Sequence, residues 1–127
     1  MLRQYVGQPY QQLDKDGMAL GCLAPIYLLY PNAPRFKWPR NKPFEKMVVQ
    51  IKKIFKQVPE SEMVAGDILV VYVPANGRHV GVYLGAGEFI HCDSVSGMEV
   101  IKLYFLDRAV EGVYRWQFLQ ELQSGHI

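Results

Sequence analysis

The sequence has few cysteines and no long apolar segment. Cys22 and Cys92 are the only cysteines among 127 residues. Neither belongs to a C-x-x-C pair, so we predict no disulfide framework and expect a free thiol at Cys22. The longest apolar stretch, Met18–Tyr30, is too short to span a bilayer and contains glycine and proline. The N-terminus has no apolar segment before a small-residue cleavage site, so we expect neither a signal peptide nor a transmembrane segment.

The sequence also lacks internal repeats and low-complexity tracts. Its composition, with 50% hydrophobic and 20% charged residues, is that of an ordinary globular chain and differs from that of disordered proteins. A chain of this length buries roughly two thirds of its unfolded surface when it folds. We therefore predict a single domain over residues 1–127.

The positive charge is concentrated in one part of the chain. Residues 35–56 contain eight lysines and arginines and one acidic residue, although the net charge of the whole chain is only +2. A basic surface attracts an anionic partner, whereas the solvent-exposed side of an ordinary helix has the same composition. Both interpretations stay open, and we expect no nucleic-acid partner.

Two helices are predicted in the first half of the chain. Helical character starts near Cys22, since Pro25 is tolerated in a first turn, and it stops at Tyr30 because the following proline disfavours the α conformation there. Residues 31–43 contain four prolines and are expected to form an extended loop. A second, amphipathic helix follows and ends at Pro59. Its apolar residues at helical spacing are Phe44, Met47, Val48, Ile51, Ile54, Phe55 and Val58.

The second half of the chain has the pattern of β-structure. Five apolar or alternating segments are separated by turn sequences. Helices followed by a series of strands predict an α+β fold, with the N-terminal helices packed on one side of a five- to six-stranded antiparallel sheet. The expected strands are residues 67–73, 78–85, 88–92, 98–105 and 112–119.

Cys22 is a candidate nucleophile. A cysteine reacts as the thiolate, so its usual pKa of about 8.5 must be lowered by a helix N-terminus or by a cationic neighbour such as a protonated imidazole. The position of Cys22 at the predicted start of a helix supplies the first of these. The second has to come from elsewhere in the fold.

Two histidines lie on the predicted hairpin GRHVGVYLGAGEFIHC. If the turn pairs Leu84 with Glu88, Gly81 lies opposite His91, and His79 is the diagonal neighbour of His91 on the same side of the sheet. The two imidazoles can then touch, and Gly81 leaves room for the second ring. A turn longer or shorter by one residue would place them on opposite sides. With the predicted pairing, His79 can act as a base for a thiol while His91 orients it.

Other interpretations remain open for these side chains. A histidine on a strand is more often a hydrogen-bonded structural residue than a catalyst, and a cysteine in an apolar segment usually packs in the core. A zinc site would combine Cys22, His79, His91 and Cys92. However, Cys92 directly follows His91 in a strand and is expected to point away, and closely spaced ligand pairs are missing. We therefore predict neither a metal nor a cofactor.

The segments VGQPYQQ…DG…GCLAPIYLLY, AGDILVVYV and GRHVGVYLGAGEFIHC, with YRW near the end of the chain, resemble the NlpC-type cysteine peptidases of the cell wall. This is a papain-like family in which a helix-borne cysteine precedes a histidine-bearing antiparallel sheet. The resemblance implies that Cys22 is the nucleophile, His79 the general base and His91 the polar residue that orients it. It also implies that Tyr10 lies beside the nucleophile and contacts the substrate carbonyl.

The resemblance further implies a substrate. Family members typically hydrolyse the D-γ-glutamyl to diamino-acid bond in peptidoglycan stem peptides, through a thioester acyl-enzyme. In this chain Gly21 stands where the family usually has an aspartate that helps to hold the amino group of the substrate. The alternatives are a non-catalytic phage tail or assembly module, and a thiol acyltransferase or amidase on the same fold.

The short chain resembles phage-encoded members of the family. We expect such a protein to stay in the cytoplasm until it is released, or to travel with the virion, and to act at the cell wall. There the basic residues 35–56 would meet anionic wall polymers.

Overall fold

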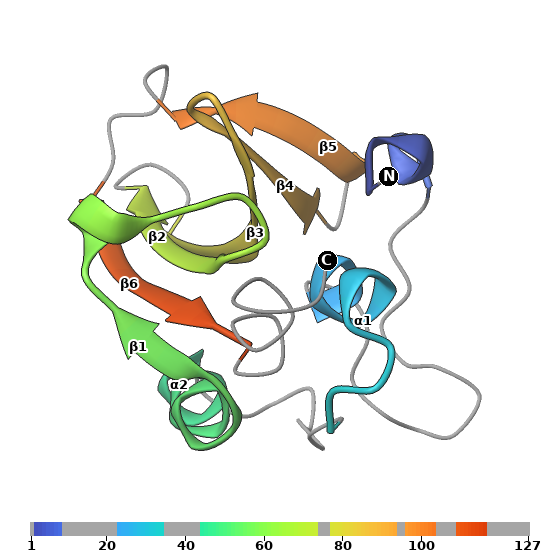
Figure 1. Cartoon of the computed structure of the whole chain (residues 1–127). Helices are drawn as coiled ribbons and strands as arrows, with labels where there is room; N and C mark the ends of the chain where they lie inside the picture. Colours follow the sequence, from blue (N-terminus) through green and yellow to red (C-terminus); the bar gives the residue numbers. More distant parts are fainter. Residues whose placement is uncertain are drawn as a thin grey trace, which may run out of the picture.

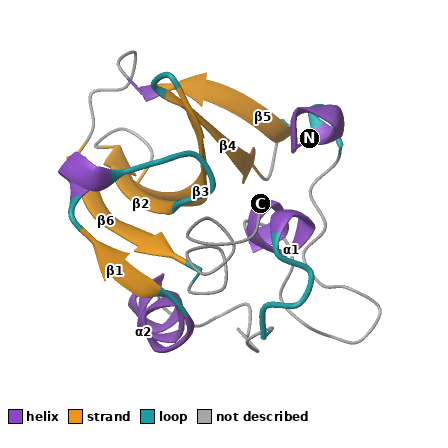
Figure 2. Cartoon of the chain, in the orientation of Figure 1, coloured by secondary structure: helices purple, strands orange, loops and turns teal. Residues whose placement is uncertain are grey.

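A six-stranded antiparallel sheet is the framework of the described part of the protein, and two α-helices lie beside it (Figure 1). Figure 2 shows the same chain coloured by secondary structure. No helix in this part is long and apolar enough to cross a membrane. The computed structural model describes residues 2–8, 23–34, 44–73, 77–93, 96–103 and 109–116.

The order of the elements confirms the predicted α+β class, with short helical segments before and between the strands. The helices are η1 (Leu2–Tyr5, 3₁₀), α1 (Ala24–Leu29), α2 (Phe44–Ile54) and η3 (Glu60–Glu62, 3₁₀). The strands are β1 (Lys56–Val58), β2 (Ile68–Val73), β3 (Gly77–Gly85), β4 (Glu88–Asp93), β5 (Gly97–Lys102) and β6 (Ala109–Arg115).

The sheet has the strand order β1-β6-β2-β3-β4-β5. From β2 to β5, each strand pairs with the next one along the chain. Strand β6 returns to the other side of β2, and β1 pairs with its outer edge. The five predicted strands are therefore all present, with different ends, and β1 is an additional strand that the sequence pattern did not predict.

The second helix is shorter than predicted, whereas the first agrees with the sequence pattern. Helix α1 has Pro25 in its first turn and ends before the next proline. Helix α2 ends at Ile54, and Lys56–Val58 forms β1 in place of a last helical turn. Pairing with β6 decides this, because it provides partners for backbone groups at the edge of the sheet and sets Val58 opposite Val113. The helical spacing of Val58 is therefore coincidental.

The sheet carries an apolar cluster on each side. Alternate residues of the strands, such as Ile68, Val80 and Ile90, pack with α1 and α2 in the larger cluster. The residues between them, such as Leu69 and Phe89, belong to a smaller cluster that contains no residue of either α-helix. Because side chains alternate along a strand, the α-helices cover one side of the sheet, as predicted.

The N-terminal segment is attached to β5. The backbone N–H of Gly7 donates to the carbonyl of Met98 at 2.8 Å, and the N–H of Met98 donates to the carbonyl of Gln8 at 2.9 Å. Figure 1 shows the N-terminus beside one end of β5. These bonds bring the beginning of the GQPY segment to the strand that pairs with β4.

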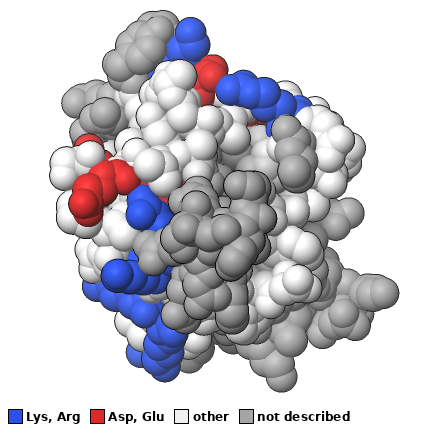
Figure 3. Space-filling model, viewed as in Figure 1, with Lys and Arg blue, Asp and Glu red and all other residues white. Residues whose placement is uncertain are grey.

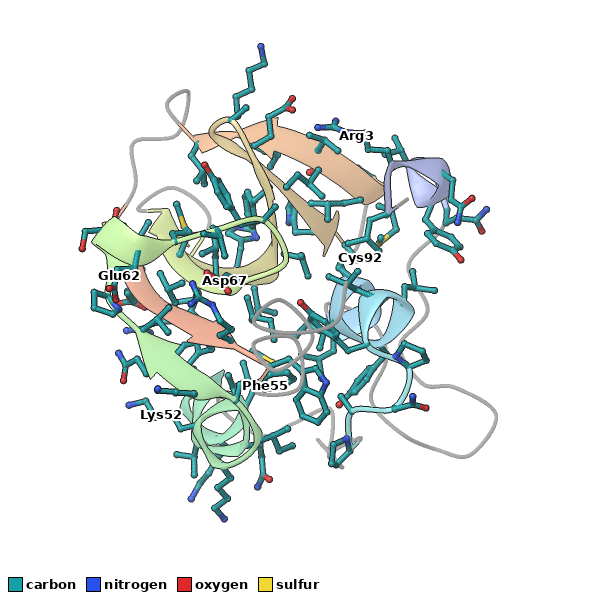
Figure 4. The ribbon with its side chains drawn as sticks, viewed as in Figure 1. Arg3, Lys52, Phe55, Glu62, Asp67 and Cys92 are labelled. Atoms are coloured by element: carbon teal, nitrogen blue, oxygen red, sulfur yellow. The ribbon has the colours of Figure 1, made fainter. Side chains whose placement is uncertain are left out.

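Asp67 and Arg115 form a buried ion pair that connects the start of β2 to the end of β6. The Asp67 side chain is fully buried, and Nε and Nη2 of Arg115 donate to its two oxygens at 2.8 Å each. The same carboxylate accepts the N–H of Val64 at 2.9 Å, and Arg115 Nη2 also donates to the carbonyl of Glu62 at 2.9 Å. The hydrogen bonds with Asp67 raise the pKa of Arg115 above its ordinary value. Figure 4 shows Asp67 in the interior of the protein, with Glu62 nearer the edge.

Tyr30 connects the end of α1 to the same region. Its hydroxyl donates to the carbonyl of Gly66 at 2.7 Å, and its ring lies 6.3 Å from that of Trp116. Phe55, just after α2, packs on Trp116 at 5.4 Å, so residues beside both α-helices meet at the end of β6. Burial, and then repulsion by the charge of Asp67, raises the pKa of Tyr30 from 10.0 to about 12.

Replacing Tyr30 by phenylalanine should lower stability at neutral pH and reduce its decline in alkali. In the unfolded chain the phenol titrates near pH 10, and in the folded chain its pKa is about 12. Below pH 10 both states keep the proton and the stabilisation is complete. Between these values the unfolded state loses the proton first, so the free energy of unfolding falls by up to about 2 to 3 kcal/mol as the pH rises.

Urea unfolding of both proteins at about pH 8 and about pH 11 measures this effect. At the lower pH, Tyr30→Phe should be less stable by about 1 kcal/mol through the lost hydrogen bond. The difference between the two proteins should shrink at the higher pH. An equal difference at both values would contradict the raised pKa.

Candidate active site

The β3–β4 hairpin has the predicted internal pairing and a different turn. Gly81 pairs with His91, as predicted. The hairpin closes on Gly85 and Glu88 instead of on Leu84 and Glu88, and a register shift before Gly85 absorbs the extra residue. The two turn residues, Ala86 and Gly87, have φ values of 52° and 77°, as in the turns that suit the twist of a hairpin. The shorter turn and the register shift compensate each other, so the histidines keep the predicted register.

His79 and His91 are in contact. Their ring centroids lie 5.2 Å apart and the rings are nearly perpendicular, at 84°. The side chain of His91 is 4% exposed, whereas His79 is only partly buried. The prediction that the two imidazoles can touch is confirmed. An accessible imidazole supported by a buried one can serve as an oriented base.

Phe89 occupies the space that Gly81 leaves open. A Cβ atom on Gly81 would overlap the carbonyl oxygen of Ile90 and would lie 2.8 Å from two ring carbons of Phe89. The Phe89 ring in turn stacks on His91, with centroids 5.3 Å apart and an interplanar angle of 19°. The expected role of Gly81 is therefore corrected, because the ring that covers it is that of Phe89, which supports one face of His91.

Glu99 belongs to this group and was missed in the sequence. It lies directly opposite His91 on β5, and its Oε1 is 2.7 Å from Nε2 of His91. Its side chain is 37% exposed, so the carboxylate lies between the buried ring and the solvent. Only the register of β4 against β5 could have identified it, and that register depends on turn residues whose conformation the sequence pattern did not fix.

The histidines and Cys92 lie on opposite sides of the sheet. His79 and His91 alternate with Val80 and Ile90, which pack on the helix side, and Cys92 is buried in that same cluster. The alternative zinc site is therefore wrong, because His91 and Cys92 cannot bind one ion together. Within the described ranges, no group of three or more His, Cys, Asp or Glu side chains is arranged to hold a metal ion.

Two of the predicted site residues, Cys22 and Tyr10, lie outside the described residues. The described chain begins again immediately after Cys22, with Leu23, which is fully buried and precedes α1. Helix α1 contacts β3 and β4, the strands that carry the two histidines. Gln8, two positions before Tyr10, is hydrogen-bonded to β5. These contacts place Leu23 and α1 on the helix side of β3 and β4 and Gln8 at the edge of β5, whereas the side chains of His79, His91 and Glu99 face the other side of the sheet.

The family of the chain follows from its sequence. A profile of the NlpC/P60 family matches residues 7–114, which include the candidate nucleophile, both histidines and nearly the whole sheet. The chain belongs to the NlpC/P60 family.

Individual relatives agree with this assignment. The chain is similar to the protein named "Murein DD-endopeptidase MepS/Murein LD-carboxypeptidase" in Escherichia coli strains K12, O6:H1 and O157:H7, with 37% identity over 43 residues. The match covers 34% of this chain and 23% of each relative, so the chain spans about a quarter of their length. Among solved structures, the NlpC/p60 domain of the peptidoglycan hydrolase SagA has a TM-score of 0.59 and 21% identity, over 89% of this chain and 91% of that one. This likeness confirms the predicted NlpC-type fold.

Replacing Gly81 by alanine should disturb the histidine pair through Phe89. The added methyl group overlaps a backbone oxygen of β4 and the Phe89 ring, so the two strands must separate and the ring must shift relative to His91. Overpacking of this kind costs about 1 to 3 kcal/mol. Chemical denaturation measures the loss, and the proton NMR shifts of the two imidazoles report the displaced ring.

A second change distinguishes the cause of this loss. In a Phe89→Leu background the ring contact is absent, so Gly81→Ala should cost less than it does in the wild type. Unchanged stability and unchanged imidazole shifts in Gly81→Ala would show that Phe89 does not couple Gly81 to His91.

Proposed function

We propose that the protein is a cysteine peptidase that acts at the cell wall and cleaves peptide bonds in peptidoglycan stem peptides. In this proposal the Cys22 thiolate attacks the substrate carbonyl carbon, and His79 takes the thiol proton and later gives it to the leaving amine. A thioester forms as the C–N bond breaks, and water then hydrolyses it to the free acid and the thiol. His91 orients His79, and Tyr10 with the Cys22 N–H stabilises the oxyanion.

The contact between His79 and His91 is the observation that carries this proposal. One imidazole is accessible and the other is buried, stacked and anchored, as required of a base and its orienting partner. Helix α1, which begins two residues after Cys22, packs on the helix side of both strands, so the proposal requires the Cys22 thiol to reach the other side of the sheet, where the histidines lie. His79 is the third residue of β3, so the proposal requires the thiol to approach it near that end of the strand.

The bond that is cleaved is a separate part of the proposal. The resemblance noted in the sequence favours the bond between D-γ-glutamate and the diamino acid. The name of the Escherichia coli relative, which contains the term DD-endopeptidase, favours a DD-peptide bond as the second candidate. Gly21 supports considering it, because an acidic residue before the nucleophile would hold the amino group near the first bond. Mass spectrometry of the products distinguishes the two bonds by the new termini.

Replacing either Cys22 or His79 by alanine should abolish peptidase activity. We expect the release of new amino groups from purified peptidoglycan to fall by at least about 1,000-fold in each variant, because nucleophile and base act as a unit. Replacing Cys92 by alanine is the matched control, since it removes the other thiol from the helix side of the sheet. That variant should keep the wild-type rate per folded molecule.

The possible results separate the candidate functions. A Cys22→Ala protein that releases amino groups at the wild-type rate would contradict the proposal. A wild-type protein that is folded but releases none, and whose Cys22 reacts with iodoacetamide at about pH 6 no faster than a free thiol, would favour a non-catalytic module.

Exposed lysines on α2 and β1 form a basic surface, which we define as Lys46, Lys52, Lys53 and Lys56. Figure 3 shows basic side chains gathered over this part of the protein. None of the four is ion-paired with another residue of the described ranges. We propose that this surface holds the enzyme at anionic wall polymers, because exposed cations near one another attract a polyanion. Residues 35–43 of the basic segment lie outside the described residues.

Replacing the four lysines of the basic surface by glutamine should weaken binding to poly(glycerol phosphate). A lysine near an anionic surface contributes about 1 kcal/mol, so a loss of at least about tenfold is expected at low ionic strength. The hydrolysis of small soluble stem peptides should not change. A control that replaces Arg3 and Lys102 by glutamine removes positive charge outside this surface and should bind nearly as well as the wild type. Equal binding by the fourfold variant, or binding that added salt does not weaken, would contradict the proposal.

A further inference from the structure

Glu99 has a place in the site that goes beyond the nucleophile, the base and the orienting histidine. We propose that Glu99 is a positioning residue, which fixes both the orientation and the tautomer of His91 and thereby supports His79 as the base. This inference rests on the proposed function in one respect, namely that His79 takes the proton of the Cys22 thiol.

The contacts of His91 leave its ring little freedom. Phe89 stacks on one face at 5.3 Å, the ring of His79 lies nearly perpendicular to it at 5.2 Å, and Glu99 Oε1 lies 2.7 Å from Nε2. Strand pairing sets the carboxylate in place, because Glu99 is the direct cross-strand partner of His91. With the side chain of His91 only 4% exposed, no bulk water competes for Nε2. A rotation of the ring would break the short contact and leave a buried polar atom without a partner.

The chemistry of the two groups determines which nitrogen of His91 carries the proton. An ionised carboxylate only accepts hydrogen bonds, so Nε2 of His91 must donate to Glu99. In the neutral ring Nδ1 then carries a lone pair and becomes an acceptor. Nδ1 of His91 can therefore accept a hydrogen bond from an N–H of the neighbouring His79. Such a bond would leave the other nitrogen of His79 as the proton acceptor for Cys22.

The carboxylate also favours the charge that forms during the reaction. When the proton moves from Cys22 Sγ to His79, the thiol becomes a thiolate and His79 becomes an imidazolium. Glu99 lies one buried ring away from that positive charge and attracts it across His91, an attraction that the solvent at the 37% exposed side chain of Glu99 partly screens. Neither Glu99 nor His91 needs to gain or lose a proton in this step. The role resembles that of the carboxylate that holds the base in other nucleophile–base groups, with a second imidazole between them.

The ordinary explanation of the contact is a cross-strand pair that contributes only to stability. Such pairs are worth about 0.2 to 1 kcal/mol and do not affect a reaction. Arg3 and Glu88 form such a pair at 2.6 Å in the same part of the sheet, with both side chains more exposed than His91. Glu88→Gln is therefore a matched control, because it removes a carboxylate from β4 without touching either histidine.

The first measurement is kinetic, with soluble stem peptides as the substrate. Glu99→Gln should lower kcat by about 10- to 100-fold, the range seen when a group that orients a metal-bound histidine is removed, and should leave KM nearly unchanged. Glu99→Asp retains the carboxylate and should recover part of the rate. Glu88→Gln should behave as the wild type. Equal kcat in Glu99→Gln and Glu88→Gln would overturn the proposal.

The second measurement does not depend on peptidase activity. Long-range ¹H–¹⁵N NMR spectra of the imidazoles should show His91 as a single Nε2–H tautomer in the wild type and in Glu88→Gln. Glu99→Gln should show the Nδ1–H tautomer or a mixture, because an amide can donate as well as accept. An unchanged tautomer in Glu99→Gln would overturn the proposal.

These results separate the failure of this inference from that of the proposed function. If the wild type cleaves no peptide, the proposed function fails, and the tautomer together with the iodoacetamide rate of Cys22 still tests Glu99. If Glu99→Gln changes the tautomer of His91 and also lowers the iodoacetamide rate of Cys22, these results support positioning by Glu99. If the wild type is active and neither quantity responds to Glu99→Gln, the proposed function stands and the role of Glu99 is excluded.

Discussion

The ion pair between Asp67 and Arg115 is the constraint on which the arrangement of the sheet depends. Asp67 is fully buried, and each of its oxygens accepts a guanidinium N–H at 2.8 Å. Removing one partner of such a pair leaves an uncompensated buried charge and costs about 3 to 5 kcal/mol, a large fraction of the stability of a small protein. The pair joins residues 48 positions apart in sequence. Hydrogen bonds from Tyr30 to Gly66 and from Tyr83 to Asp67 connect this ion pair to α1 and β3.

The pairing of the strands sets the geometry of the candidate site. Strand β3 is held between β2 and β4, so His79 cannot shift along its strand without breaking two ladders. Each side-chain contact of the site then follows from register: His91 faces Gly81 on one strand and Glu99 on the other. A slip of one residue would move both histidines to the helix side of the sheet. The positions of the imidazoles are therefore set by backbone pairing before any contact between the side chains adds to them.

The sequence was sufficient where a pattern is local and insufficient where distant segments meet. Alternation and turn chemistry predicted the strands of the hairpin and the contact of His79 with His91. The helical spacing of Val58 predicts a helix where β1 lies. Only the pairing with the edge of β6 makes this segment a strand. Asp67 and Arg115 were visible in the GD and YRW segments, but nothing local joins them. The roles of Cys22 and Tyr10 stay predictions, since both lie outside the described residues.

Two carboxylates of this protein illustrate how environment separates structural from functional acids. Asp67 is fully buried, and its carboxylate accepts hydrogen bonds from Val64 and Arg115, which hold the start of β2 to the end of β6. Glu99 makes its short contact to the buried imidazole of His91, and its side chain is more than a third exposed. An acid that only had to stabilise the sheet would gain little in this half-exposed position, because solvent screens its charge. The same position suits an acid that must keep its charge while it holds a buried ring, since water stabilises the carboxylate and the ring keeps water from Nε2.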